Sequence, residues 1–242
     1  MSKTASPNGT HVIQFGGETI PFTLEMRQRR RLSISVQPDR RVTVLAPVDC
    51  RLADVLVRVH KRAAWIIRQR AYFEQFHPLP REKRYVSGET HLYLGRQYRL
   101  KIHSAAAESV KLTGGYLHVA TANRPDALQV QRLFDDWYRH HARGIFHTRL
   151  LQCLDAAPSL RMPPPAIIIR RMSRRWGSCT KAGNILLNLD LVKTPLYCIE
   201  YVLMHELCHL RIHNHSPSYY RLLSRCMPDW EKRKTRLDSY VM

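Results

Sequence analysis

The segment over residues 195–212 constrains the fold of this chain most strongly. Its apolar residues recur at three- and four-residue spacing, which predicts a largely buried helix, and Thr194-Pro195 is a pair typical of a helix start. Within this segment lie His205 and His209, four residues apart. Side chains at that spacing lie one above the other on one helix face. Both imidazoles can therefore reach one bound ion.

Glu206 directly follows the first histidine of this pair. It lies about 100° around the helix from His205, beside the histidine pair rather than on it. A carboxylate there can take a proton from an attacking water molecule without occupying a coordination position. Polar side chains on a buried helix need partners, and a metal ion supplies them most simply. The pattern indicates a hydrolytic metal site; the alternative is a pair of core histidines beside a surface glutamate.

A third ligand is expected, because a hydrolytic zinc site usually has three protein ligands and one open position. If the helix continued to His213, the Cα atom of that residue would lie about 12 Å from the Cα of His205. The chain must therefore leave the helix and turn back. Asn214 suits a left-handed helix end, and Ser216-Pro217 predicts that another helix begins there. We expect His215, in this corner, to be the third ligand. His213 would then support the site, lie at the surface or donate a hydrogen bond in the transition state.

Three runs of sequence carry a family resemblance. Residues 205–215 read His-Glu-Leu-Cys-His-Leu-Arg-Ile-His-Asn-His, residues 175–179 read Arg-Trp-Gly-Ser-Cys, and residues 184–188 read Asn-Ile-Leu-Leu-Asn. Together they resemble the YgjP-like zinc metallopeptidases, which are similar to the SprT/Spartan-type proteases. Residues 31–36 and 88–100 resemble the N-terminal half of that family.

The resemblance implies a HExxHxxxxxH site for one zinc ion. Its ligands would be His205, His209 and His215, and Glu206 would be the catalytic acid/base. The sequence departs from the family after the third histidine, where Tyr219-Tyr220 stand in place of the usual Phe and Trp. This departure concerns the wall of the pocket rather than the metal ligands.

Several other residues are candidates for a role in the site. Trp176, Gly177 and Ser178 would shape the floor of the cleft or give a backbone donor to the substrate carbonyl; a packing turn is the alternative. The run 185–189, which includes Asn188, is either an edge strand on which an extended peptide adds or an internal strand. The candidate donors to the oxyanion are His213, Tyr219 and Tyr220. Cys208, between the histidines, is expected in the core.

The rest of the chain alternates strand groups with long helices. Short β-rich runs predict strands over residues 11–15, 19–26, 32–36, 42–46, 91–94, 97–103, 110–112, 116–120 and 166–170. Apolar spacing predicts helices over 51–76, with Asp49 as N-cap, and over 125–154. Residues 77–84 read as a linker. These patterns predict an α+β protein in three parts: a strand-rich region over 1–84, a second strand group and helix over 85–160, and a zincin-like metallopeptidase unit with a central HExxH helix over 161–242.

The charge of the chain is unusual. Lys and Arg number 39 and Asp and Glu 19, so the formal net charge is +20. A charge of this size favours acidic partners, with nucleic acid first among them. The predicted helix over 51–76 carries a row of cations that is either a solvated face or a nucleic-acid face: Arg51, Arg58, Lys61, Arg62, Arg68 and Arg70.

The sequence also predicts where the protein works. No apolar run is long enough to cross a membrane, and the first residues lack the apolar segment of a secretory signal. The six cysteines form no CxxC pair, as expected of reduced thiols in the cytoplasm. The leading hypothesis is a cytoplasmic zinc metallopeptidase that cleaves proteins or peptides. The alternatives are a DNA-associated protease that acts on DNA-bound or crosslinked proteins, and a DNA-binding module with a structural zinc, which would not need Glu206.

Overall fold

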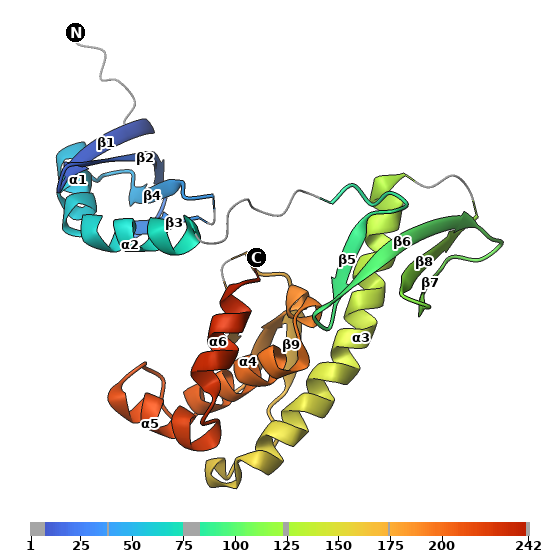
Figure 1. Cartoon of the computed structure of the whole chain (residues 1–242). Helices are drawn as coiled ribbons and strands as arrows, with labels where there is room; N and C mark the ends of the chain where they lie inside the picture. Colours follow the sequence, from blue (N-terminus) through green and yellow to red (C-terminus); the bar gives the residue numbers. More distant parts are fainter. Residues whose placement is uncertain (1–7, 38, 75–82, 123–125, 174, 241–242) are drawn as a thin grey trace. The chain divides into compact units, whose positions relative to one another are not determined.

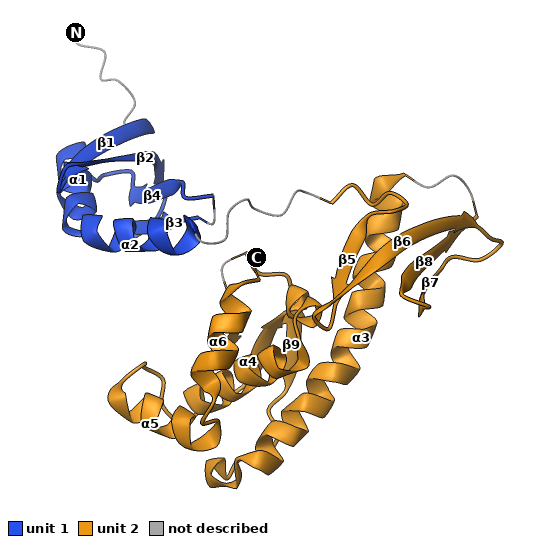
Figure 2. Cartoon of the chain, in the orientation of Figure 1, with its two compact units in different colours: residues 1–81, 241 blue, residues 82–240, 242 orange. Residues whose placement is uncertain are grey.

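The structure is a computed structural model that describes residues 8–37, 39–74, 83–122, 126–173 and 175–240. These described residues contain three sheets and six α-helices, which confirms the α+β class (Figure 1). They group into two compact units, one within residues 1–81 and one within residues 82–240 (Figure 2). The division into three parts at 84 and 160 stays a prediction.

Unit 1 is a four-stranded sheet with two helices. The strands are β1 (Gly9–Phe15), β2 (Glu18–Arg27), β3 (Ser33–Val36) and β4 (Val42–Pro47), in the order β1-β2-β4-β3. Strand β2 is parallel to β4, and the other pairs are antiparallel. Apolar residues from the sheet and both helices form a separate core, which includes Ile20, Leu24, Val44, Val55, Val59 and Ile66. All four strands lie where the sequence predicts them.

The helix predicted over 51–76 is two helices, α1 (Leu52–Lys61) and α2 (Ala63–Glu74). They are separated at Arg62, whose φ and ψ are −101° and 2°. Val59 and Ala63, which are both buried, lie on either side of this break. Because they are four residues apart, the helical spacing of apolar residues continues across the break, and the sequence pattern cannot reveal it. The expected cap at Asp49 is wrong, because Arg51 is the N-cap residue of α1 and makes no side-chain cap. Most of the predicted linker lies outside the described residues.

Unit 2 begins with a second four-stranded sheet. Its strands are β5 (Thr90–Tyr93), β6 (Arg96–Ser104), β7 (Ser109–Thr113) and β8 (Tyr116–Thr121), in the order β5-β6-β8-β7. The 30-residue helix α3 (Ala127–Ala156), capped by Asp126, follows. Aromatic contacts join its first half to β5, with the ring of Trp137 4.8 Å from that of Tyr93. Its second half reaches the helix of the candidate site, since Arg149 pairs with Glu200.

The remaining elements surround the candidate site. A three-stranded sheet is formed by β9 (Ile167–Arg170), β10 (Gly177–Cys179) and β11 (Ile185–Asn188), in the order β10-β11-β9. The helices are α4 (Leu196–His209), α5 (Pro217–Cys226) and α6 (Trp230–Asp238). Because β11 is the middle strand, the edge-strand alternative for residues 185–189 is wrong, and β10 is an edge strand instead.

The turn between β5 and β6 fixes the start of α4. The backbone N–H groups of Leu94 and Gly95 donate to the carbonyls of Val192 and Lys193, just before the helix. Gly95 has φ of 78°, and a Cβ on it would lie 2.6 Å from Cγ of Pro195. A glycine is therefore required where the β5–β6 turn touches the start of the helix of the candidate site.

Candidate metal centre

The helix predicted over 195–212 ends early, at His209. The chain leaves α4 there and forms a corner, in which the His209 ring nitrogen Nδ1 lies 3.1 Å from the Ile212 carbonyl oxygen. Ser216 caps the next helix by accepting a hydrogen bond from the Tyr219 N–H, and Pro217 occupies its first turn. His215 therefore lies between the two helices. Asn214 is not among the residues with positive φ in the described chain, so the expected left-handed conformation is wrong.

Three imidazole rings converge at this corner. The Nε2 atom of His209 lies 3.1 Å from that of His205 and 3.0 Å from that of His215, and the remaining pair is 3.3 Å apart. Zinc lies about 2.0–2.1 Å from imidazole nitrogens, which separates neighbouring ligands of a tetrahedral site by about 3.3 Å. The three side chains therefore have the spacing of metal ligands.

The charge state of these rings also suits a cation. Burial, with smaller contributions from His209 and His215, lowers the pKa of His205 to about 3. Burial also lowers the pKa of His209, against the opposing effect of the Ile212 carbonyl. A neutral His209 that donates from Nδ1 to this carbonyl keeps the lone pair of Nε2 toward the other rings. Ring nitrogens with facing lone pairs this close together are stabilised by a metal ion.

Glu206 lies between α4 and the edge strand β10. Its side chain is buried, with 5% of the residue exposed. Burial raises the pKa of Glu206 to about 7, although the Arg175 guanidinium and the Cys179 N–H act in the opposite direction. A Cβ on Gly177 would lie 2.8 Å from Oε1 of Glu206 and 2.9 Å from Cγ1 of Val202. Only a residue without a side chain allows β10 to approach the carboxylate so closely.

The register of β10 explains how its backbone reaches Glu206. Backbone hydrogen bonds join Trp176 to Asn188 and Thr180 to Asn184 across the pair. In an antiparallel pair, hydrogen-bonded positions alternate with positions whose backbone groups point outward. Gly177 and Cys179 occupy the outward positions, so the Cys179 N–H is directed away from β11 and can donate to the Glu206 carboxylate.

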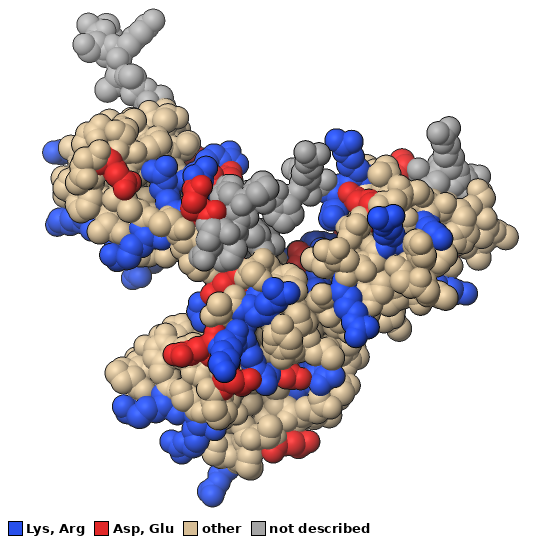
Figure 3. Space-filling view, in the orientation of Figure 1, with Lys and Arg blue, Asp and Glu red and all other residues tan. Residues whose placement is uncertain are grey.

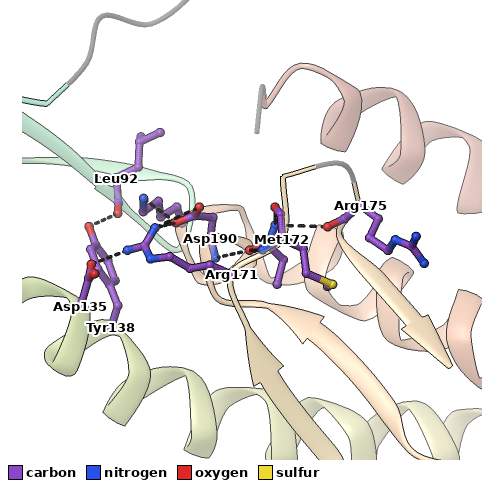
Figure 4. A network of polar contacts seen from close by, with 9 residues as sticks. Leu92, Asp135, Tyr138, Arg171, Met172, Arg175 and Asp190 are labelled. Atoms are coloured by element: carbon purple, nitrogen blue, oxygen red, sulfur yellow. Dashed lines mark hydrogen bonds and ion pairs between the residues drawn. The ribbon is translucent and has the colours of Figure 1, made fainter. Parts of the chain in front are cut away.

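The segment before β10 is held by a polar network. The fully buried Asn188 donates to the carbonyls of Met172 and Arg175, at 2.7 and 3.2 Å. Beside it, Arg171 bridges Asp190, at 3.2 Å, and Asp135 of α3 (Figure 4). Asn188 therefore fixes the backbone that leads into the strand behind Glu206.

The two tyrosines after the third histidine differ in environment. Tyr219 is fully buried, its ring stacks on that of His209 at 4.4 Å, and its hydroxyl donates to the His205 carbonyl at 3.2 Å. Tyr220 is 41% exposed, and its ring lies 5.6 Å from Trp230 and 6.1 Å from His215. His213 is exposed. Tyr219 thus supports the ligand helix from within the core, while Tyr220 and His213 are exposed to solvent.

Comparison with known proteins identifies the family of this chain. Residues 30–240 match the YgjP-like metallopeptidase domain. The chain belongs to the YgjP-like metallopeptidases. Two solved structures are similar over 38% of this YgjP-like chain: the metallopeptidase zymogens of Pyrococcus abyssi abylysin (23% identity, 90% of that chain, TM-score 0.35) and Methanocaldococcus jannaschii jannalysin (19%, 92%, 0.33). No curated protein matches the chain.

Two features of this YgjP-like site were not predicted from the sequence. One is the backbone of Cys179, whose N–H reaches Glu206; the other is the hydroxyl of Tyr219, which supports the His205 carbonyl. A glycine inside a short apolar segment signals close backbone approach, so Gly177 could have pointed to the first. Within the described residues, no helix has both the length and the apolar character needed to cross a bilayer.

Proposed function

We propose that this YgjP-like metallopeptidase hydrolyses peptide bonds with one zinc ion held by His205, His209 and His215. The observation that carries the proposal is the convergence of three Nε2 atoms, 3.0–3.3 Å apart, at the end of the helix that bears the buried Glu206. Zinc at this position would polarise the scissile carbonyl and lower the pKa of water from 15.7 toward about 7.

Other residues of the chain would transfer the proton, position the general base and stabilise the oxyanion. Glu206 takes the proton of the attacking water and passes it to the leaving amine, as a general base and then a general acid. The Cys179 N–H and the tight contact with Gly177 hold its carboxylate in place. His213 and Tyr220 are our candidates for the donor to the oxyanion, since both are exposed near the corner whereas the Tyr219 hydroxyl is bound to the His205 carbonyl.

We place the protein or peptide substrate beside Trp176, Gly177 and Ser178. Strand β10 is at the edge of its sheet and directs the backbone of Gly177 outward, so an extended chain can approach there. Asn188 contributes indirectly, because its hydrogen bonds fix the segment that precedes this strand.

The test of this proposal separates the base from the ligands. Glu206→Gln keeps the shape of the side chain but cannot accept the proton, so activity on an unfolded protein substrate should fall roughly 10²–10⁴-fold while zinc stays near one per chain. His215→Ala removes a ligand, so the protein should lose metal as well as activity. Elemental analysis and a cleavage assay measure both.

His213→Ala is the matched control, because it removes a neighbouring imidazole that lies outside the three-histidine cluster. It should keep zinc and lose activity only in part. If His213→Ala loses the metal and His215→Ala keeps it, the ligand set is wrong.

Two alternatives lead to different results. A DNA-associated protease, suggested by the net charge of +20, would bind DNA in a salt-dependent manner and cleave faster in its presence. A structural zinc would leave Glu206 without a role, and Glu206→Gln would then change nothing. The SprT-like relationship and the cytoplasmic location stay predictions.

A further inference from the structure

A groove of about 590 Å³ lies within unit 1, whereas the three histidines of the metal centre belong to unit 2. We call it the β3 groove; its lining residues are Leu32, Ser33, Ile34, Arg58, Lys61, Arg62 and Trp65. The three consecutive residues 32–34 all line this groove. Consecutive residues of a strand point to opposite faces of the sheet, so this groove follows the edge of β3 rather than one face.

The outer edge of β3 has backbone groups that point away from the sheet, and Ile34 on this edge lines the groove. Strand β3 is the last strand of its sheet, with β4 on one side only. The Gln37 N–H donates to the Arg41 carbonyl, and this pair sets the alternation along β3. By that alternation Ile34 and Val36 are outward positions, so their N–H and C=O groups point away from β4.

Cations line the helical wall of the β3 groove. Arg58, Lys61 and Arg62 are exposed, and among the described residues none of their side chains makes an ion pair or hydrogen bond. A further cation reaches the strand wall, since Arg29 donates to the Ser33 hydroxyl at 2.9 Å and its buried Nε has no partner in the described chain.

The acidic residues of unit 1 do not neutralise the groove. Three of the six are already paired with other arginines: Glu25 with Arg27, Asp39 with Arg41 and Glu74 with Arg40. The other three, Glu18, Asp49 and Asp54, do not line the groove. Blue side chains also predominate over red on the face of unit 1 in Figure 3. The free edge, the unpaired cations and Trp65 therefore occupy one groove and lack an anionic partner.

We propose that the β3 groove binds an acidic, extended polypeptide segment, which adds as a fifth strand to the edge of β3. The main chain of this segment pairs with the outward backbone groups of Ile34 and Val36. Its acidic side chains meet Arg58, Lys61 and Arg62, and its apolar side chains contact Trp65. This binding is independent of zinc and of Glu206, so it can fail or hold without affecting the proposed peptidase mechanism.

Fluorescence anisotropy of a labelled eight-residue peptide of alternating Glu and Val, titrated with the full-length protein, tests the proposal. We expect saturable binding that weakens as salt is added. A peptide of equal charge with Pro in place of every Val lacks half of the N–H groups and should not bind. The double variant Arg58→Glu/Lys61→Glu should bind the first peptide at least about tenfold more weakly, because two attractive charges become repulsive.

The matched control is Arg68→Glu/Arg70→Glu, which changes the net charge equally but lies on α2 outside the β3 groove. Its affinity should stay within about twofold of the parent, and thermal melts of both variants should show folded protein. Three results would each overturn the proposal. The first is equal binding of the proline peptide. The second is that the Glu-Val peptide does not bind, whereas labelled oligothymidylate binds and is weakened by Arg58→Glu/Lys61→Glu. The third is that no probe binds, in which case the cations only protect the edge.

Discussion

Gly177 and Glu206 are in such close contact that a Cβ on residue 177 would lie 2.8 Å from the Glu206 Oε1 atom. This contact joins the edge strand β10 to the ligand helix α4, and the Cys179 N–H from the same strand acts to lower the pKa of the carboxyl group. The position of the proposed general base is therefore set by a strand about thirty residues earlier in the chain, as well as by its own helix.

Gly177→Ala should displace the Glu206 carboxylate, because the new methyl group has no space beside Oε1 and Val202. We expect a loss of about 10²-fold in kcat, as for misplaced catalytic groups, with zinc still bound. Gly144→Ala is the control, since its Cβ would meet nothing within 4 Å and it lies inside α3. That variant should keep full activity and gain up to about 1 kcal/mol in stability. Equal activity of both variants would contradict this role of Gly177.

Removal of the metal should destabilise the protein. Zinc that binds only the folded chain adds about 2.7 kcal/mol to the free energy of unfolding at 100 times its Kd. Thermal melts with added zinc and with a chelator should therefore differ by several degrees. The melting temperature of His215→Ala should not respond to either. A parent protein with the same Tm under both conditions would argue against a zinc site coupled to folding.

Tyr219→Phe tests whether the Tyr219 hydroxyl has a structural role, in support of α4, or donates to the oxyanion. The Tyr219 hydroxyl donates to the His205 carbonyl and the buried ring stacks on His209. Loss of the hydroxyl should cost about 1 kcal/mol in stability and reduce kcat only a few-fold. An oxyanion donor would instead lose roughly 10²–10³-fold in kcat. Tyr220→Phe is the companion variant, and the larger kcat loss identifies the donor if a tyrosine supplies it.

The stability of unit 2 should depend on the protonation of His91. This residue is 4% exposed, stacks on Phe134 and lies 3.0 Å from a Glu89 oxygen. Burial lowers the pKa of His91 to about 4, although Glu89 acts in the opposite direction. Between pH 4 and the unfolded pKa of about 6.5, the unfolded chain binds the proton and the folded chain does not.

The contribution of His91 to the free energy of unfolding is therefore complete above about pH 6.5. It is lost as the pH falls toward 4, and the loss is at most about 3 kcal/mol. Urea unfolding of the parent and of His91→Gln at pH 5 and 7 measures it. The parent should lose more stability than the variant over this range. Parallel losses in the two proteins would show that His91 has no part in the pH dependence.

The local features of this protein can be predicted from its sequence. The helical spacing before His205 predicts α4, the Ser216-Pro217 pair predicts the start of α5, and β-rich runs predict the strands of unit 1. Each of these depends on residues within a few positions of one another, so propensity and capping are visible in the chain. The corner that holds His215 follows from the same local argument, because a straight helix cannot bring a third imidazole to the pair.

Which helices and strands contact one another can be seen only in the folded protein. Periodicity cannot tell an edge strand from a middle strand, so the order β10-β11-β9 had to come from two pairings, Gly177 with Leu187 and Ile185 with Ile167. The break at Arg62 was hidden because the apolar residues on both sides face one core. The contacts of Glu206 with Gly177 and Cys179 arise only when a strand and a helix distant in sequence pack together. Such contacts depend on the whole fold, whereas a sequence motif records only the spacing along the chain.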